Sequence, residues 1–149
     1  MYQRNILIEH TDPEDVQRWV LRDRRYLDQW SKGRITLVGD AAHATSPYAA
    51  YGAGMSIEDG YFLGRALRGV DLTDQRAVEA ALLAYETPRK PHTTFQVRLA
   101  WINGQMFHHA PSWLQPIRDF VFDHTPLLQK VIGDASPGEI NKQLDLITD

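Results

Sequence analysis

Cysteine is absent from this 149-residue chain, and its absence removes several classes of function. Disulfide bonds, thiolate metal sites and cysteine nucleophiles all require a thiol, and a chain without one suits a reducing compartment. The sequence also lacks an apolar run of the roughly 20 residues that cross a bilayer, and its charged first residues are unlike a signal peptide. We therefore expect a cytoplasmic protein.

An excess of charge of one sign is also missing. The 16 basic and 19 acidic residues give a formal net charge of -3, which provides no attraction to nucleic acid or to an anionic membrane. The adjacent His108 and His109 project apart and have no carboxylate at helical ligand spacing, so no metal site is expected. With 43% hydrophobic and 23% charged residues, the chain can bury the core of one domain.

The third absence concerns nucleotide binding. The only G-x-G is Gly52-Ala53-Gly54, and no third glycine follows it at the spacing of a dinucleotide-binding βαβ unit. A nucleotide site in this chain would therefore need another arrangement, or residues from another polypeptide.

The segment 33–60 carries the strongest functional signal that is present. An apolar run at 35–38 has the length of a strand, and Gly39-Asp40 ends it with a residue pair that lets a ligand approach the main chain. A loop of small residues follows, and a helix begins at 52–54. Nucleotide cofactors of open α/β sheets lie just beyond the strand tips, where this turn is expected.

Four motifs occur in order along the chain: GDAAH at 39–43, a loop proline at Pro47, GAG…ED at 52–59 and YExxRxP at 85–91. In these motifs the chain resembles the class A flavoprotein monooxygenases, the para-hydroxybenzoate hydroxylase-like family that includes salicylate hydroxylase-type enzymes. The resemblance is clear from Trp19 to Pro91 and loose elsewhere.

The resemblance implies an FAD site built by a strand tip and a helix start. A carboxylate such as Asp40 suits a ribityl hydroxyl donor, and Gly39 has no Cβ to block the cofactor. The free N–H groups at the start of the next helix suit the N1–C2=O edge of the flavin, where negative charge gathers on reduction. The expected cofactor-binding residues are Gly39, Asp40, Pro47, Gly52, Ala53 and Gly54.

The same motifs assign no catalytic side chain outright, and His43 and Tyr48 are candidates only. We expect His43 to organise the loop by hydrogen bonding rather than to act as a base. Tyr51 stands near a position where many relatives carry glutamine or a small residue. Packing against neighbouring helices is the expectation for both tyrosines.

The charged residues of the two later motifs are expected to be structural. Glu58 and Asp59 are adjacent on a helix and therefore point in different directions, with Asp59 supporting the start of the helix or a buried polar contact. Arg89 lies three residues after Glu86, which predicts a pair on the helix surface.

The expected fold class is mainly α with a short β portion, as the C-terminal fragment of an α/β FAD-binding (para-hydroxybenzoate hydroxylase-like) fold. We expect short extended segments at 5–9 and 18–21, and a turn at 11–14 before a brief helix. Thr73 or Asp74 caps a second long helix that stops or kinks near Pro88 and Pro91, and a third helix follows at about 93–107.

Prolines cut the last third of the chain into short helices, and a terminal helix begins at 136–139. Apolar stripes and aromatic residues predict the core. The candidates are Met55, Ile57, Phe62, Leu63, Ala66, Leu67, Val78, Ala81, Leu82, Tyr85, Trp113, Leu114, Ile117, Phe120, Val121, Phe122, Leu127, Leu128, Val131 and Ile132, with Trp19, Trp30 and Trp101 as core or interface anchors.

Three regions follow: a remnant of a substrate-domain strand and connection at 1–32, a flavin-contacting strand, loop and helices at 33–92, and a C-terminal helical region at 93–149. The resemblance implies a monooxygenase that acts on an aromatic or polyketide-like small molecule through a flavin C4a-hydroperoxide, with NAD(P)H as reductant and O2 as co-substrate. Because no GxGxxG precedes the motif, we expect the lone chain to be incomplete.

Two alternatives remain at this point. The chain is a non-redox helical binding module derived from the same fold, or it is the C-terminal half of a split flavoenzyme. In the second case, a separate polypeptide with the GxGxxG motif completes the site. A homo-oligomer is a further possible assembly.

Overall fold

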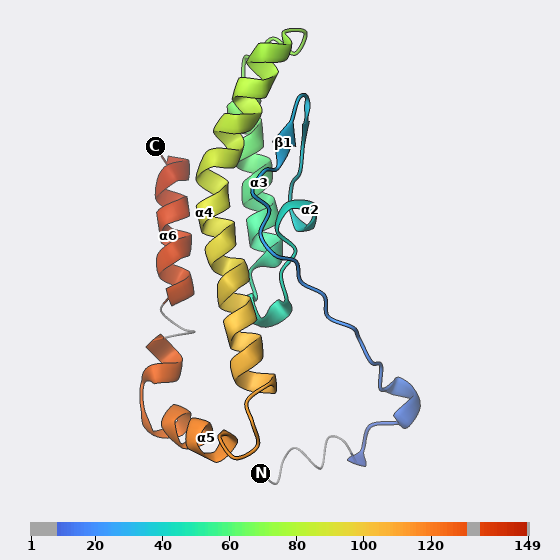
Figure 1. Ribbon diagram of the computed structural model, residues 1–149, viewed down its shortest axis with the longest axis vertical. Coiled ribbons are helices and arrows are strands. Elements are labelled where there is room, and N and C mark those ends of the chain that lie inside the picture. Colours follow the sequence, from blue (N-terminus) through green and yellow to red (C-terminus); the bar gives the residue numbers. More distant parts are fainter. Residues whose placement is uncertain (1–8, 131–134, 149) are drawn as a thin grey trace.

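The computed structural model describes residues 9–130 and 135–148, and helices make up most of it (Figure 1). The elements in chain order are η1 (Pro13–Asp15), β1 (Ser31–Lys32), β2 (Ile35–Thr36), α2 (Asp40–His43), η2 (Pro47–Ala49), α3 (Gly52–Leu67), α4 (Gln75–His108), α5 (Gln115–His124) and α6 (Ala135–Thr148). The predicted mainly α class with a short β portion is confirmed. No helix in the described ranges is both long enough and apolar enough to cross a membrane.

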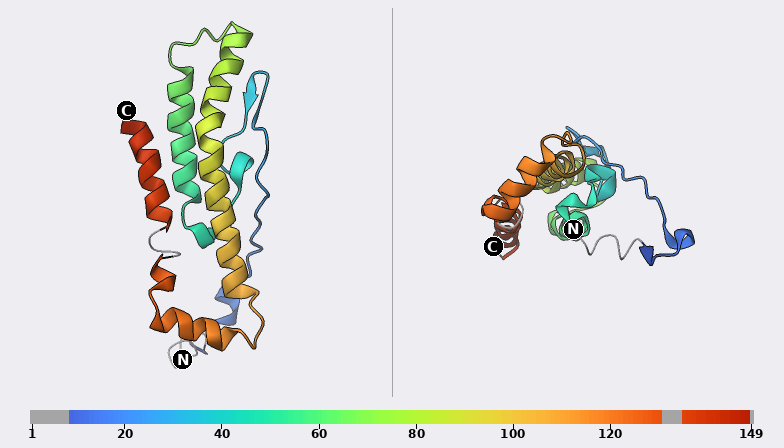
Figure 2. Two further views of the ribbon diagram at one scale, coloured as in Figure 1. Left: turned by 60° about the vertical axis from the view of Figure 1, so that its left-hand side comes forward. Right: turned by 90° about the horizontal axis from the view of Figure 1, so that it is seen from below.

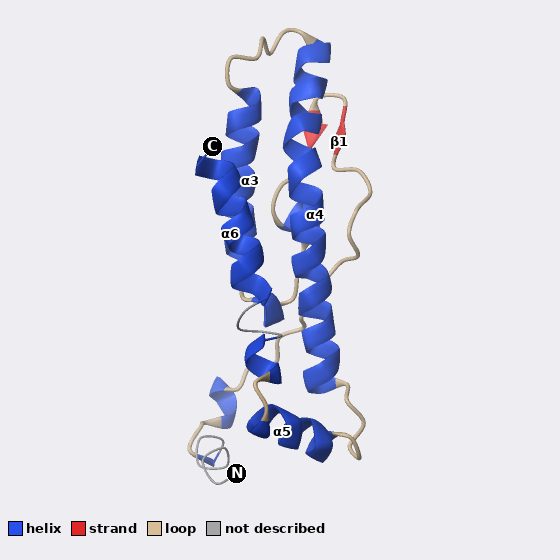
Figure 3. Ribbon diagram, turned by 90° about the vertical axis from the view of Figure 1, so that its left-hand side faces the viewer, coloured by secondary structure: helices blue, strands red, loops and turns tan. Residues whose placement is uncertain are grey.

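The long helices α3 and α4 lie side by side, and α6 runs beside them (Figure 3). Asp74 begins α4 as predicted, because its carboxylate accepts from the N–H groups of Arg76 and Ala77. The apolar core sits where the hairpin, α2 and the two long helices meet. Its buried members are Trp30, Ala42, Phe62 and Tyr85.

Of the apolar run at 35–38, only Ile35 and Thr36 form a strand. This strand, β2, pairs antiparallel with β1 in a short hairpin. Ser31 pairs with Thr36 and Lys32 pairs with Ile35, with Gly33 at a φ of 58° in the turn. The strand expected over 35–38 is therefore shorter than predicted, because β2 ends at Thr36. The predicted helix after 11–14 is confirmed as η1, residues 18–21 form no strand, and residues 5–8 of the predicted first segment lie outside the described residues.

Helix α4 does not stop at its two prolines, and the separate third helix predicted at about 93–107 is the second half of α4. It continues for 34 residues through Pro88 and Pro91. A proline inside a helix costs about 3 kcal/mol because it removes one hydrogen bond and crowds the preceding turn. One buried face runs through both positions, and this uninterrupted packing offsets the cost. Its residues are Val78, Ala81, Leu82, Tyr85, Glu86, Arg89, His92, Thr93, Gln96, Val97, Ala100 and Asn103.

Several predicted core residues are exposed. On α5 and the turn before it, Trp113, Ile117 and Phe120 are 71%, 55% and 62% exposed, because α5 crosses below the end of α4 instead of packing along the α3–α4 pair (Figure 2). Ile57 lies on the outer face of α3 and is 76% exposed. Of the four tryptophans, only Trp30 is in the core. The predicted core residues Val131 and Ile132 lie outside the described residues.

Candidate flavin-binding site

The GDAAH turn is fixed by a carboxylate from α3. Gly39 is buried with φ 55° and ψ -139°, a combination that favours glycine. Its N–H donates to Asp59 Oδ2 at 2.8 Å. Asp40 is the next residue, the first of α2, and it is exposed. The backbone of the turn is therefore fixed by the buried Asp59 carboxylate, while the Asp40 carboxylate remains accessible to a ligand.

The strand tip and the start of α3 meet at Ser56. A Cβ added at Gly39 would lie 2.9 Å from Ser56 Oγ. The same hydroxyl donates to the Gly52 carbonyl at 3.1 Å. One short side chain thus connects the two glycines that the sequence assigns to one cofactor.

The first turn of α3 has free donors. The N-cap residue, Tyr51, makes no side-chain cap hydrogen bond, and the first backbone bond into the helix runs from the Met55 N–H to the Tyr51 carbonyl at 3.0 Å. Within the described part of the chain, the N–H groups of residues 52–54 have no acceptor. Free N–H groups at a helix start attract negative charge.

Gly54 is needed for a reason that the motif alone does not reveal. A Cβ at this position would lie 2.4 Å from the Tyr51 ring, so the ring packs directly against the helix backbone. The Tyr51 hydroxyl in turn donates to Glu58, which lies seven residues or about two helical turns further along. Burial, followed by the hydrogen bond to Glu58, raises the pKa of Tyr51 above its ordinary value, so the hydroxyl remains a neutral donor.

A buried charge network lies directly behind the turn. His43 Nε2 is 2.7 Å from Asp59 Oδ2, and Arg89 Nε donates to Asp59 Oδ1 at 2.8 Å. The Arg89 and Asp59 side chains are both 0% exposed. The predicted surface pair of Arg89 with Glu86 is therefore wrong. Glu86 instead accepts from the Ser31 N–H at 3.0 Å.

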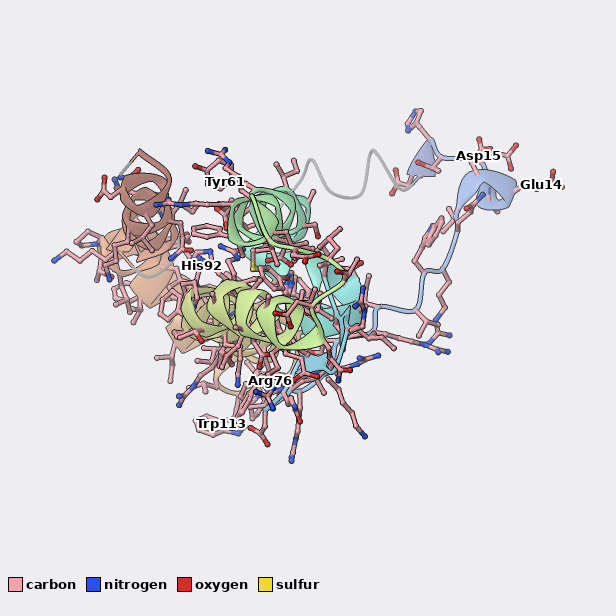
Figure 4. The ribbon with its side chains drawn as sticks, turned by 90° about the horizontal axis from the view of Figure 1, so that it is seen from above. Glu14, Asp15, Tyr61, Arg76, His92 and Trp113 are labelled. Atoms are coloured by element: carbon pink, nitrogen blue, oxygen red, sulfur yellow. The ribbon has the colours of Figure 1, made fainter. Side chains whose placement is uncertain are left out.

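Arg89 joins both carboxylates of the ED motif. Its Nη1 lies 2.6 Å from Glu58 Oε2, and its Nη2 donates to the Met55 carbonyl at 3.0 Å. His92, a buried residue of α4, lies 3.4 Å from the same Glu58 oxygen (Figure 4). The two carboxylates thus converge on one guanidinium, contrary to the expectation that they diverge. The buried contact expected for Asp59 is confirmed, and the role of Arg89 was missed.

Hydrogen bonding keeps both carboxylates ionised. Burial alone would raise the pKa of Asp59, but hydrogen bonds from His43 and the Gly39 N–H outweigh burial and hold this pKa below its ordinary value. The pKa of Glu58 is lowered in the same way, first by its hydrogen bond with His92. The network is therefore charged at neutral pH.

We expect the protein to lose stability in acid because of these two groups. Since their folded pKa values lie below those of the unfolded chain, the unfolded chain binds more protons as the pH falls. Their contribution is complete above the unfolded carboxylate pKa of about 4 and is lost as the pH falls through the lower folded values. Urea unfolding from about pH 7 to about pH 3 measures this loss. A Glu58→Gln/Asp59→Asn variant should have a flatter profile, and an equally steep one would contradict the assignment.

The remaining candidates lie at the end of α2 and in the loop between α2 and α3. His43 is 3% exposed and holds Asp59, a geometry that suits positioning of the turn. Tyr48 packs on α4, where a Cβ at Gly104 would lie 3.2 Å from its ring and where the His108 ring centroid is 5.1 Å away. Pro47 is exposed at the start of η2. The loop therefore presents Pro47 on the surface and anchors Tyr48 to α4.

Comparison with known proteins agrees with this geometry. The family model described as FAD binding domain matches residues 5–100. The chain is 37% identical over 112 residues to 3-hydroxybenzoate 6-hydroxylase of Klebsiella oxytoca, covering 74% of this chain and 26% of that protein. It is also 37% identical over 89 residues to salicylate hydroxylase of Pseudomonas putida, covering 60% of this chain and 20% of that protein.

The fold has a counterpart among solved structures. The crystal structure of Klebsiella pneumoniae HpxO complexed with FAD and uric acid superposes with a TM-score of 0.73 at 24% identity, over 94% of this chain and 34% of that one. This chain spans about a quarter of the length of the curated relatives named above. From the match over residues 5–100 and these relatives, the chain belongs to the FAD-binding domain family, among the class A flavin monooxygenases.

Proposed function

We propose that this chain forms the wall of an FAD site that faces the ribityl chain and the pyrimidine edge of the flavin, in an enzyme that hydroxylates a small aromatic molecule. One observation carries the proposal: an accessible Asp40 carboxylate and the uncapped start of α3 are held next to each other through Ser56. When bound, FAD supplies the redox chemistry with NAD(P)H and O2.

The residues present suit the cofactor. Asp40 is an acceptor-only group for a ribityl hydroxyl, and its position at the head of α2 leaves it exposed. The N–H groups of Gly52, Ala53 and Gly54 suit the N1–C2=O edge, because preorganised donors stabilise charge that develops during reaction. Pro47, exposed in the loop between these two parts, borders the ring in this arrangement.

We assign His43 and Tyr48 positioning roles in this function. The buried His43–Asp59 pair holds the GDAAH turn, and the contact of Tyr48 with α4 fixes the loop. A buried side chain engaged with a carboxylate is poorly placed to exchange protons with a substrate. We propose a hydroxylated aromatic ring as the substrate, supported by relatives named for 3-hydroxybenzoate, salicylate and 6-hydroxynicotinate.

The proposed organisation keeps the three regions 1–32, 33–92 and 93–149, with cofactor contacts concentrated in the second. This chain spans about a quarter of the relatives' length. That share supports a site whose other walls are supplied by further sequence. That sequence either continues this polypeptide or belongs to a partner polypeptide. Purification of the chain with and without a co-expressed dinucleotide-fold protein distinguishes these arrangements by the flavin absorption bands. Absence of flavin in both preparations would favour a non-redox module instead.

Replacing Asp40 tests the cofactor contact. We expect Asp40→Ala to raise the dissociation constant of FAD at least about tenfold, because a hydrogen bond to a charged group contributes about 1.5–3 kcal/mol. Fluorescence titration of FAD measures the change. Asp123→Ala, which removes an exposed carboxylate on α5, serves as the matched control and should bind FAD normally. Normal FAD affinity in Asp40→Ala would refute the contact.

A further inference from the structure

A cavity outside the candidate flavin site lies between the extended segment before β1 and the second half of α4. Its volume is about 510 Å³, within the range of roughly 300–1,000 Å³ typical of small-molecule sites. The side chains that define its chemistry are Arg24, Arg25, Tyr26, Val97, Arg98 and Trp101. None of these residues takes part in the flavin contacts proposed above.

The lining of this cavity, which we call the basic cavity, concentrates positive charge. Three arginines and a single carboxylate, that of Asp23, line it and give the lining a formal charge of +2, on a chain whose formal net charge is -3. Neither Arg25 nor Arg98 has an ion pair with another described residue. Like charges gathered without counter-charges repel one another, and a bound anion would relieve that repulsion.

Aromatic side chains border the same charges. Tyr26 is 61% exposed and Trp101 is 54% exposed, although both rings border one cavity. Val97 is 8% exposed and lies one helical turn before Trp101, so it forms an apolar floor. Exposed aromatic faces beside guanidinium groups offer a stacking surface for a planar base.

The segment that carries two of the arginines is fixed to α2. The Arg24 N–H donates to the Ala44 carbonyl at 3.3 Å, and Arg24 Nη1 donates to the Ala41 carbonyl at 3.0 Å. Because Ala41 follows Asp40 in the GDAAH motif, the basic cavity adjoins the candidate flavin site without sharing its residues. The basic wall is therefore attached to the scaffold of that site.

We propose that the basic cavity binds the adenosine diphosphate moiety of a nucleotide. The base stacks on Trp101 and Tyr26, and the two phosphates accept hydrogen bonds from Arg25 and Arg98. A guanidinium group donates two parallel hydrogen bonds to a pair of phosphate oxygens. The single carboxylate in the lining cannot engage all three guanidinium groups. A nicotinamide dinucleotide and free ADP both carry this moiety, so the chemistry is shared and the source is settled by experiment.

Titration of the chain with ADP, followed by calorimetry, tests the proposal. We expect Arg98→Ala to weaken ADP binding at least about tenfold through the loss of charge-assisted hydrogen bonds. Arg76→Ala is the matched control, since Arg76 is exposed on the same helix about 33 Å away along its axis, at 1.5 Å per residue (Figure 4). Trp101→Leu should also weaken binding, and added salt should weaken it in the wild type.

The controls separate the parts of the ligand and the two sites. Adenosine and pyrophosphate should each bind more weakly than ADP, and Asp40→Ala should leave ADP binding unchanged. A loss of NADPH affinity in Arg98→Ala identifies a nicotinamide dinucleotide as the source of the moiety, and a loss for ADP alone identifies free ADP. No binding of ADP by the wild-type chain, tighter binding of 3-hydroxybenzoate than of ADP, or equal losses in Arg98→Ala and Arg76→Ala would overturn the proposal.

Discussion

Arg89→Met is expected to lower the free energy of unfolding by about 3–5 kcal/mol, because it leaves two buried carboxylates without their cation. The guanidinium lies 2.8 Å from Asp59 and 2.6 Å from Glu58, and the side chain is fully buried. Methionine fills part of the space but donates no hydrogen bond. Urea denaturation at neutral pH, with the slope compared between variants, measures the effect.

Two further variants show whether charge is the cause. Arg76→Met removes an exposed arginine from the same helix and should change stability by less than about 0.5 kcal/mol. Adding Glu58→Gln and Asp59→Asn to Arg89→Met should restore part of the loss, since the uncompensated charges then disappear. If the triple variant is no more stable than Arg89→Met, packing rather than charge explains the role of Arg89.

The consequence for function follows from Asp59. This carboxylate binds Arg89 through one oxygen, while the other accepts from the Gly39 N–H and contacts His43. When Arg89 is lost, Asp59 is free to shift, and the GDAAH turn loses its fixed support. We therefore expect FAD affinity to fall in Arg89→Met even under conditions where the variant is fully folded.

The sequence predicted that the GDAAH and GAG motifs lie together, but it did not predict the charge network behind them. GDAAH and GAG are local motifs, and they meet at Ser56 as expected of one cofactor site. Arg89 lies 30 residues from Asp59, and a spacing of three residues from Glu86 favoured the wrong partner. The buried face of α4 contained the missing signal, since Arg89 is four residues after Tyr85 and shares its side of the helix.

The errors in the helices also have physical causes. Local rules stop a helix at Pro88, but they do not count the packing of a face that continues on both sides of it. Apolar residues of α5 were assigned to a core because their spacing is amphipathic, yet spacing gives no information on what covers that face. Ile117 and Phe120 were assigned to the core in this way, and both are exposed.

Gly39→Ala should have the second large effect, at roughly 2–5 kcal/mol of lost stability. Two costs add. A side chain at a φ of 55° is strained, and the new Cβ would lie 2.9 Å from Ser56 Oγ. Ser56 can rotate away only by giving up its hydrogen bond to the Gly52 carbonyl, which holds the start of α3. The substitution should therefore weaken FAD binding as well as folding.

Gly33→Ala separates the two costs of this substitution. Gly33 has a φ of 58°, and a Cβ there meets nothing within 4 Å, so alanine incurs only the backbone cost of about 1–2 kcal/mol. The excess loss in Gly39→Ala measures the contact with Ser56. Ser56→Ala in the Gly39→Ala background should recover that excess and leave the backbone strain. Equal losses for the two glycines would mean that the strand tip and the start of α3 are not coupled through Ser56, and the arrangement proposed for the flavin would lose its support.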